Sequence, residues 1–180
     1  MNAERPIAPD PYAHLDPAPS FLLESDDLID GGEVPVAQRR AGAGGGDQSP
    51  HLRWSGFPEE TKSFAVTCFD PDAPTVSGFW HWLVGGIDGD VVELPRGAGT
   101  GDEALPKGAL HMRNDFGDLN YAGAAPPAGD RAHRYMFVVH ALSDSVEDIE
   151  FESSDTPAAA SFNMLAAELA RATLTVTYQR

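Results

Sequence analysis

The segment SFAVTCFDPDAPT, residues 63–75, is the strongest indication of this chain's architecture. Its first part, Ser63–Phe69, is rich in β-branched and aromatic side chains, which predicts a strand. Two prolines follow within five residues, and each fixes φ and removes a backbone donor. We therefore expect a strand that ends in a rigid turn presenting Asp70 and Asp72. The alternative is an ordinary surface turn whose aspartates bond to their own backbone.

Similar strand patterns follow this segment along the chain. Four further stretches are rich in β-forming residues: FWHWLV (79–84), Val91–Leu94, RYMFVVHAL (134–142) and TLTVTY (173–178). Turn-forming pairs such as Gly85-Gly86 and Asp88-Gly89 separate them. Because the strands are short and closely spaced, with no alternation of strands and helices, the pattern favours a mainly β domain.

One helix is predicted near the C-terminus. Thr156 is a suitable N-cap, Pro157 suits the first helical position, and Ala158–Arg171 can follow. Within it Phe162, Leu165 and Leu169 would form one apolar face. The predicted fold class is thus mainly β, an antiparallel β-sandwich with a few short helices and one C-terminal helix (about 157–171) followed by a last strand.

The chain length and the proline distribution indicate a single domain with an arm. A chain of 180 residues and 19.2 kDa favours one domain. Five prolines within the first 20 residues predict an extended N-terminal arm over 1–20 and a single domain over 21–180. The glycine-rich segment Ala41–Asp47 lacks the Lys-Ser/Thr and helix of a phosphate loop, so we interpret it as a flexible connection.

Charge and cysteine content limit the partners and the compartment. Twelve basic and 28 acidic residues give a net charge of −16, which argues against nucleic acid and against stable association with anionic membranes. Cys68 is the single cysteine, so no intrachain disulfide is possible. Neither a signal peptide nor an apolar run of about 18 residues is visible. We expect a soluble, cytoplasmic protein.

Two histidines lie in strand patterns beside aromatic residues. In FWHWLV, strict alternation would place His81 on one face and both neighbouring tryptophans on the other. After the double proline Pro126-Pro127, His133 and Tyr135 are two residues apart and share a face, while Arg134 points the other way. Ordinary packing, with the imidazole and phenol satisfied internally, is the alternative interpretation.

These groups would form an anion site if their strands are neighbours. Two imidazoles and the phenol of Tyr135 can donate hydrogen bonds to an anion. The carboxylates of Asp70 and Asp72 would orient the rings of His81 and His133 and raise the pKa of both. A phosphate monoester could then be held without a lysine or a phosphate loop.

The motifs DPDAPT, GFWHW, NDFG, YAGAAPPAG and HRYMFVVHAL, in that order, resemble the phosphatidylethanolamine-binding protein family, most closely its bacterial Raf-kinase-inhibitor-like branch. The resemblance runs from about Pro19 to the C-terminus. It implies a mainly antiparallel β fold with a small anion pocket, and a cis bond before Pro74. The pocket positions it implies are Asp70, Asp72, Ala73, Pro74, His81, Pro126, Pro127, His133 and Tyr135.

One departure from the family pattern lies near this implied pocket. Where the family commonly has Gly-Pro before the variable residue and the double proline, Gly123 is followed by two alanines. A rigid proline is missing, which predicts a looser pocket rim.

The leading functional hypothesis is a non-enzymatic binding module with no cofactor and no catalytic residue. Its partners would be a small phosphate-like anion, a phospholipid head group, a nucleotide or a phosphorylated protein, with modulation of a kinase or another enzyme as a weaker hypothesis. The bacterial branch also implies a homodimer. The alternatives are a hydrolase or lyase using the His/Asp cluster, although G-x-S-x-G is absent, and a metal-binding protein, although H-x-x-x-H and C-x-x-C are absent.

Overall fold

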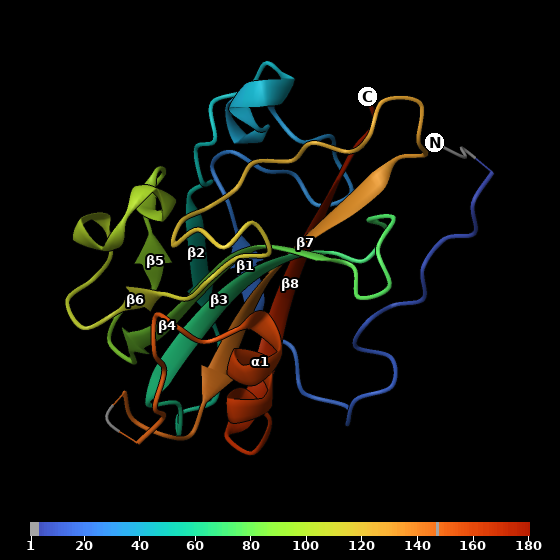
Figure 1. Cartoon of the computed structure of the whole chain (residues 1–180). Helices are drawn as coiled ribbons and strands as arrows, with labels where there is room; N and C mark the ends of the chain where they lie inside the picture. The colour runs from blue at the N-terminus through green and yellow to red at the C-terminus, as the bar shows by residue number, and fades with distance from the viewer. Residues whose placement is uncertain (1–3, 147) are drawn as a thin grey trace.

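The computed structural model describes residues 4–146 and 148–180 and has two antiparallel sheets (Figure 1). The larger sheet has the strand order β6-β4-β3-β7-β8 and the smaller has the order β1-β2-β5. The strands are β1 (Leu22–Glu24), β2 (Leu52–Ser55), β3 (Ser63–Asp70), β4 (Phe79–Asp88), β5 (Glu93–Leu94), β6 (Leu110–His111), β7 (His133–Leu142) and β8 (Glu168–Tyr178). One α-helix, α1 (Pro157–Leu165), and four 3₁₀ turns complete the described elements: Val36–Gln38, Ala41–Ala43, Ala98–Thr100 and Asp102–Ala104.

Strand β3 lies at the middle of the larger sheet, and the strand predicted over Ser63–Phe69 is confirmed. All eight of its residues are buried, and it is paired on both edges, with β4 and with β7. On its inner face Phe64, Val66 and Cys68 belong to the core between the two sheets, together with Leu52 and Trp54 of β2. Burial of such apolar side chains is the main stabilising contribution to a sandwich of this size.

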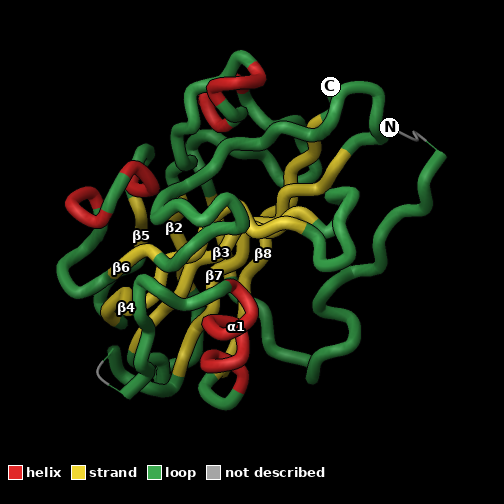
Figure 2. Tube along the Cα trace, in the orientation of Figure 1, coloured by secondary structure: helices red, strands yellow, loops and turns green. Residues whose placement is uncertain are grey.

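The outer face of the larger sheet is covered by α1 and by the N-terminal arm (Figures 1 and 2). Met164 of α1 packs with Ala65 and Leu142, while Ala160 packs with Leu83 and Met112, so the helix binds the sheet at two places. No helix in the described ranges is long and apolar enough to cross a membrane.

The predicted mainly β fold with one C-terminal helix and a last strand is confirmed, but the helix is shorter than expected. It begins as predicted, with Thr156 Oγ1 accepting from the Ala159 amide at 3.3 Å, and it ends at Leu165. From Glu168 the chain is already strand, because pairing with β7 satisfies its backbone out to Tyr178. This long-range pairing overrides the local helix preference.

The predicted apolar face of that helix is also wrong. Phe162 and Leu165 are 75% and 52% exposed, and Leu169 lies in β8. The buried helical residues are Ala160 and Met164, which face the sheet four residues apart. The position of the sheet, and not the size of the side chains, selects the buried face.

The glycine-rich segment is held in place, where a flexible connection was predicted. The carboxylate of Asp47 accepts from the Ala41 amide at 2.9 Å and from the Gly123 amide at 2.8 Å. A Cβ on Gly45 would lie 2.1 Å from the Arg39 carbonyl oxygen. The segment therefore needs its glycine for close backbone packing.

The described part of the arm, residues 4–20, contains neither helix nor strand. It lies along the outer side of the larger sheet (Figure 1). The Ala8 carbonyl accepts from Arg134 Nη2 at 2.7 Å, and the Pro19 carbonyl accepts from the Arg171 amide at 3.0 Å. The arm is thus attached to β7 and β8.

Candidate functional site

A cavity of about 150 Å³ lies where three neighbouring strands meet at one edge of the larger sheet. β3 ends at Asp70, β4 begins at Phe79 and β7 begins at His133; because these strands are antiparallel neighbours, their ends coincide. Eight of the nine predicted positions line the cavity, and Asp72 does not. The lining residues are Asp70, Ala73, Pro74, Thr75, Phe79, His81, Phe116, Ala125, Pro126, Pro127, His133 and Tyr135.

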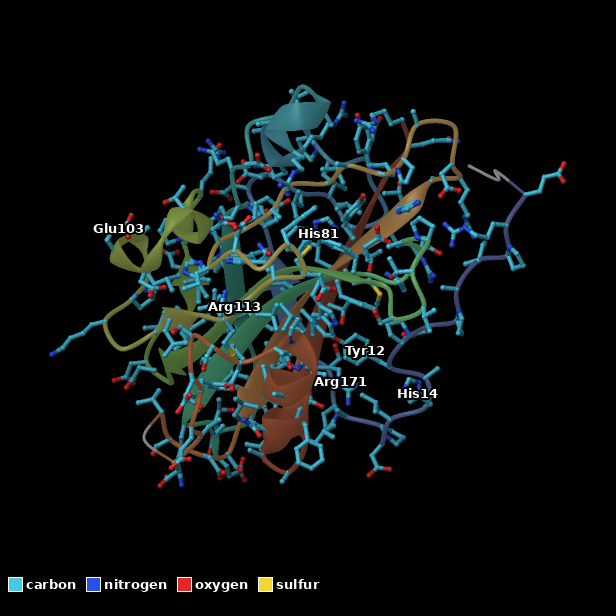
Figure 3. All side chains as sticks on the ribbon, in the orientation of Figure 1. Tyr12, His14, His81, Glu103, Arg113 and Arg171 are labelled. Atoms are coloured by element: carbon cyan, nitrogen blue, oxygen red, sulfur yellow. The ribbon has the colours of Figure 1, made fainter. Side chains whose placement is uncertain are left out.

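A β-bulge brings His81, which is labelled in Figure 3, into this cavity. Cys68 pairs with Trp82 and Phe69 with Trp80, so His81 is the extra residue between them. The two tryptophans therefore lie on opposite faces: Trp82 in the core between the sheets, Trp80 against the outer cluster. The prediction that they share a face is wrong, because a bulge breaks the alternation on which it depends.

His133 is held between two carboxylates. Its Nδ1 lies 2.7 Å from Asp70 Oδ2 and its Nε2 lies 3.3 Å from Asp130 Oδ2. Burial alone would lower the pKa of His133, but the hydrogen bond and charge of Asp70, reinforced by Asp130, raise it. The site thus favours a positively charged imidazolium at this position. Asp130 was missed in the sequence, because a carboxylate in a turn three residues before a strand gives no distinctive signal.

His81 is in the opposite state. Its Nδ1 lies 2.8 Å from the Ala122 carbonyl oxygen, which can only accept, so Nδ1 carries the proton. Burial lowers the pKa of His81 and outweighs the opposing charge of Asp70. The ring is therefore neutral at pH 7, and Nε2 is the nitrogen left for a ligand. The prediction that both histidine pKa values are raised holds for His133 and is wrong for His81.

Tyr135 lies beside His81, with ring centroids 5.1 Å apart in an edge-on arrangement. Burial, together with the charge of Asp70, raises the pKa of the Tyr135 phenol, so the hydroxyl stays protonated and can donate. A neutral imidazole, an imidazolium and a phenol thus meet around one small volume.

Asp72 has a structural position instead of a place in the cavity. It accepts from Arg134 Nε at 2.7 Å and from the Arg134 amide at 3.1 Å, and the Ala8 amide donates to it at 3.2 Å. Burial would raise the pKa of Asp72, but the hydrogen bonds from Arg134 lower it. Its own amide donates to Asp70 Oδ1 at 2.8 Å, which is the turn bond of the alternative interpretation.

The bond before Pro74 is trans, as are all peptide bonds of the described chain, so the implied cis bond is wrong. The Thr75 amide donates to the Ala73 carbonyl at 2.8 Å, closing a tight turn around Pro74. The trans isomer is the intrinsically preferred form before proline, and this turn accommodates it.

The rim that lacks the family proline is held by backbone pairing. The Ala124 amide donates to the Gln38 carbonyl at 3.1 Å, and the Ala124 carbonyl accepts from the Arg40 amide at 3.0 Å. This pairing replaces the rigidity expected from proline. It also places the Arg40 guanidinium over Phe116, 3.7 Å from the ring centroid, at the cavity wall. Arg40 was missed, because its distance in sequence from the other site residues hides this contact.

The described residues, 4–146 and 148–180, contain no group of three His, Cys, Asp or Glu side chains placed to hold a metal ion. Both ring nitrogens of His133 are occupied by carboxylates. Cys68 is fully buried, and burial raises the pKa of its thiol. The site residues can supply directed hydrogen bonds and, at His133, positive charge.

Comparison with known families and proteins gives consistent matches. The family described as phosphatidylethanolamine-binding protein matches residues 24–179. The protein YbhB of Escherichia coli K12 is 46% identical over 158 residues, which cover 87% of this chain and 98% of YbhB. The E. coli protein YbcL is 44% identical over 165 residues, or 90% of this chain and 89% of YbcL.

Solved structures agree with these matches. The crystal structure of E. coli YbcL, described as a new member of the mammalian PEBP family, superposes with a TM-score of 0.85 at 43% identity, covering 89% of this chain and 99% of that one. A phosphatidylethanolamine-binding protein homologue from Chlamydia trachomatis superposes with a TM-score of 0.75 at 26% identity, covering 91% and 99%.

Proposed function

The chain belongs to the phosphatidylethanolamine-binding protein family, in the branch of YbhB and YbcL, and from this membership and the cavity geometry we propose that it is a non-enzymatic module that binds a small phosphate-like anion. The ligand is a phosphate monoester or diester, either free or as the head group of a phospholipid. It enters the cavity at the edge of the larger sheet, between His81 and Tyr135.

One observation carries the proposal: His133, whose pKa is raised by its carboxylate partner Asp70, and the phenol of Tyr135 line the same cavity of about 150 Å³. At about 30 Å³ for each water in the liquid, this space is equivalent to about five water molecules. That volume suits one phosphoryl group, with the rest of a larger ligand outside the cavity. The imidazolium supplies charge and the phenol a directed donor.

The carboxylates near the cavity do not argue against an anion. Asp70 and Asp130 face His133, Asp72 faces Arg134, and Arg5 Nη2 lies 3.2 Å from Asp130 Oδ2. Each carboxylate is therefore paired with a cation. Tyr135 and the Nε2 side of His81 are left to meet the ligand.

Binding of phosphoethanolamine, followed by calorimetry at pH 7, tests the proposal. We expect Tyr135→Phe to weaken binding about 5- to 10-fold, as expected for the loss of one hydrogen bond. The matched control is Tyr178→Phe, which removes the same atom from a buried tyrosine of β8 outside the cavity lining. Absence of binding by the native chain, or equal loss in both variants, would overturn the assignment.

A second comparison separates the sources of the ligand. Glycerophosphoethanolamine represents a lipid head group, and phosphate represents a free anion. The source with the lower dissociation constant is the favoured one, and release of a product from glycerophosphoethanolamine would contradict the non-enzymatic assignment. The homodimer, the modulation of a kinase and the cytoplasmic location stay predictions.

A further inference from the structure

A second and larger cavity, about 240 Å³, lies on the opposite face of the larger sheet. It is enclosed by the N-terminal arm, by the outer side of the sheet and by α1; Figure 3 shows Tyr12, His14 and Arg171 in this region. Its lining residues are Pro11, Tyr12, His14, Leu15, Phe69, Ser77, Trp80, His140, Ser161, Met164, Leu165 and Glu168. It shares no lining residue with the anion cavity.

The walls of this second cavity are aromatic and aliphatic. The rings of Phe69 and Trp80 are 4.5 Å apart between centroids and tilted by 41°. Trp80 reaches this face only because of the bulge at His81. Met164 approaches from α1, and its flexible, polarizable thioether adapts well to the edge of a flat ring. Such walls favour a planar, apolar ligand.

The charged groups at one end of the cavity are already paired. Glu168 accepts from His140 Nδ1 at 2.6 Å and from Arg171 Nη2 at 2.8 Å. The second ring nitrogen of His140 lies 3.2 Å from Thr67 Oγ1. A charged ligand at this end would find no opposite charge without displacing one of these partners, so this end of the cavity favours an uncharged group.

One buried polar atom in the lining has no partner within the described residues. Ser161 Oγ, on α1, is buried and makes no hydrogen bond within the described residues. A buried hydroxyl without a partner is unfavourable, and a ligand that donates to it relieves the cost. The lining thus combines apolar walls with one buried hydroxyl that is left to pair with a ligand.

We propose that this cavity is a second ligand site, which binds a small, uncharged, bicyclic aromatic molecule carrying one hydrogen-bond donor. A cavity of about 150 Å³ lined by apolar side chains accepts benzene. The larger volume here therefore fits a bicyclic ring. The donor pairs with Ser161 Oγ, and the ring lies against Trp80 and Met164.

Indole is the probe for this site, and benzofuran, of the same shape without the N–H, is its matched analogue. With methionine methyl groups labelled with ¹³C, indole should shift the signal of Met164, which lines the cavity. Ser161→Ala should weaken indole about 5- to 10-fold and leave benzofuran unchanged, because only indole uses the hydroxyl.

A filling variant gives the decisive result. Ser161→Phe should abolish binding of both probes, whereas Asn163→Phe, at an exposed position of the same helix, should not. Thermal unfolding of both variants shows whether each is folded. No Met164 shift at millimolar indole, or retained affinity in a folded Ser161→Phe chain, would overturn the proposal. Phosphoethanolamine binding at the first cavity is measured separately and should not change.

Discussion

His81 and His133 show how two histidines at one cavity acquire opposite protonation states. His81 is buried against a backbone carbonyl, and desolvation lowers its pKa. His133 is equally inaccessible to solvent but faces two carboxylates, and their hydrogen bonds and charges raise its pKa. The raised pKa of His133 depends chiefly on Asp70 and is reinforced by Asp130, which no motif predicts. His133 thus favours the charged form, while the neutral His81 can take up a proton.

This difference predicts the pH dependence of anion binding. A bound anion favours the charged form of His81, so its pKa is higher in the complex than in the free protein. The affinity for sulfate, whose charge is constant in this range, should therefore rise as the pH falls from 7 to 5. His81→Gln should lose this rise, measured by calorimetry at each pH. An unchanged pH profile in the variant would show that a group other than His81 takes up the proton on binding.

The raised pKa of His133 predicts a second pH effect, on stability. The folded-state pKa lies above the unfolded value of about 6.5, so the stabilising contribution is fully present below that value and is lost as the pH rises through the folded pKa. His133→Gln should cost about 2–3 kcal/mol at pH 6, because Asp70 and Asp130 lose their cation. Thermal unfolding of both chains from pH 5 to 9 checks this. A cost that grows with pH would contradict it.

Among the elements, the turn between β3 and β4 joins the fold to the site. It carries Asp70 at its start and returns the chain to Phe79. Gly78 is its critical residue: its φ is +69°, and a Cβ there would lie 2.4 Å from the Phe69 ring and 2.9 Å from the Asp70 carbonyl oxygen. Any side chain at this position would displace Phe69, which lines the second cavity, and Asp70, which lines the anion cavity.

Gly78→Ala should therefore lower stability and anion affinity together. The left-handed φ alone costs about 1–2 kcal/mol, and the contacts with Phe69 and Asp70 add to it. The matched control is Gly56→Ala, which has a φ of +76° and no atom within 4 Å; it should carry the backbone cost only and bind phosphoethanolamine normally. Unfolding in urea gives both stabilities. Equal effects of the two variants would show that the contact at Gly78 is unimportant.

The elements also show what the sequence can predict. Strands β3 and β7 follow from local composition, and the N-cap at Thr156 follows from local chemistry. The bulge at His81 and the early start of β8 do not, because both depend on the register with a partner strand. The motifs predict most of the residues that line the anion cavity. They do not predict Arg40, which packs on Phe116, or Asp130, which bonds His133, because both contacts depend on how loops fold back onto the site.

The distribution of charge along the chain permits binding of a small free anion but opposes binding to an anionic membrane surface. Residues 1–33 hold eight acidic residues and one arginine, and residues 143–157 hold six acidic residues and no base. The site residues all fall between these tracts. A surface of anionic lipids would therefore meet a net charge of −16, whereas a single small anion meets the paired groups of the cavity within a few ångströms.

The chain should thus bind phosphoethanolamine in solution and yet fail to float with vesicles of anionic phospholipid, at 20 mM salt as at 150 mM. Repulsion extends over a Debye length of about 8 Å at the higher salt and further at the lower, so low salt should not promote binding. A variant with Asp144, Asp148 and Glu152 replaced by Asn, Asn and Gln keeps the cavity residues and loses part of the repulsion. It should bind phosphoethanolamine with the native affinity. Flotation of the native chain at low salt would show instead that a local patch on its surface binds the vesicles despite the repulsion from the net negative charge.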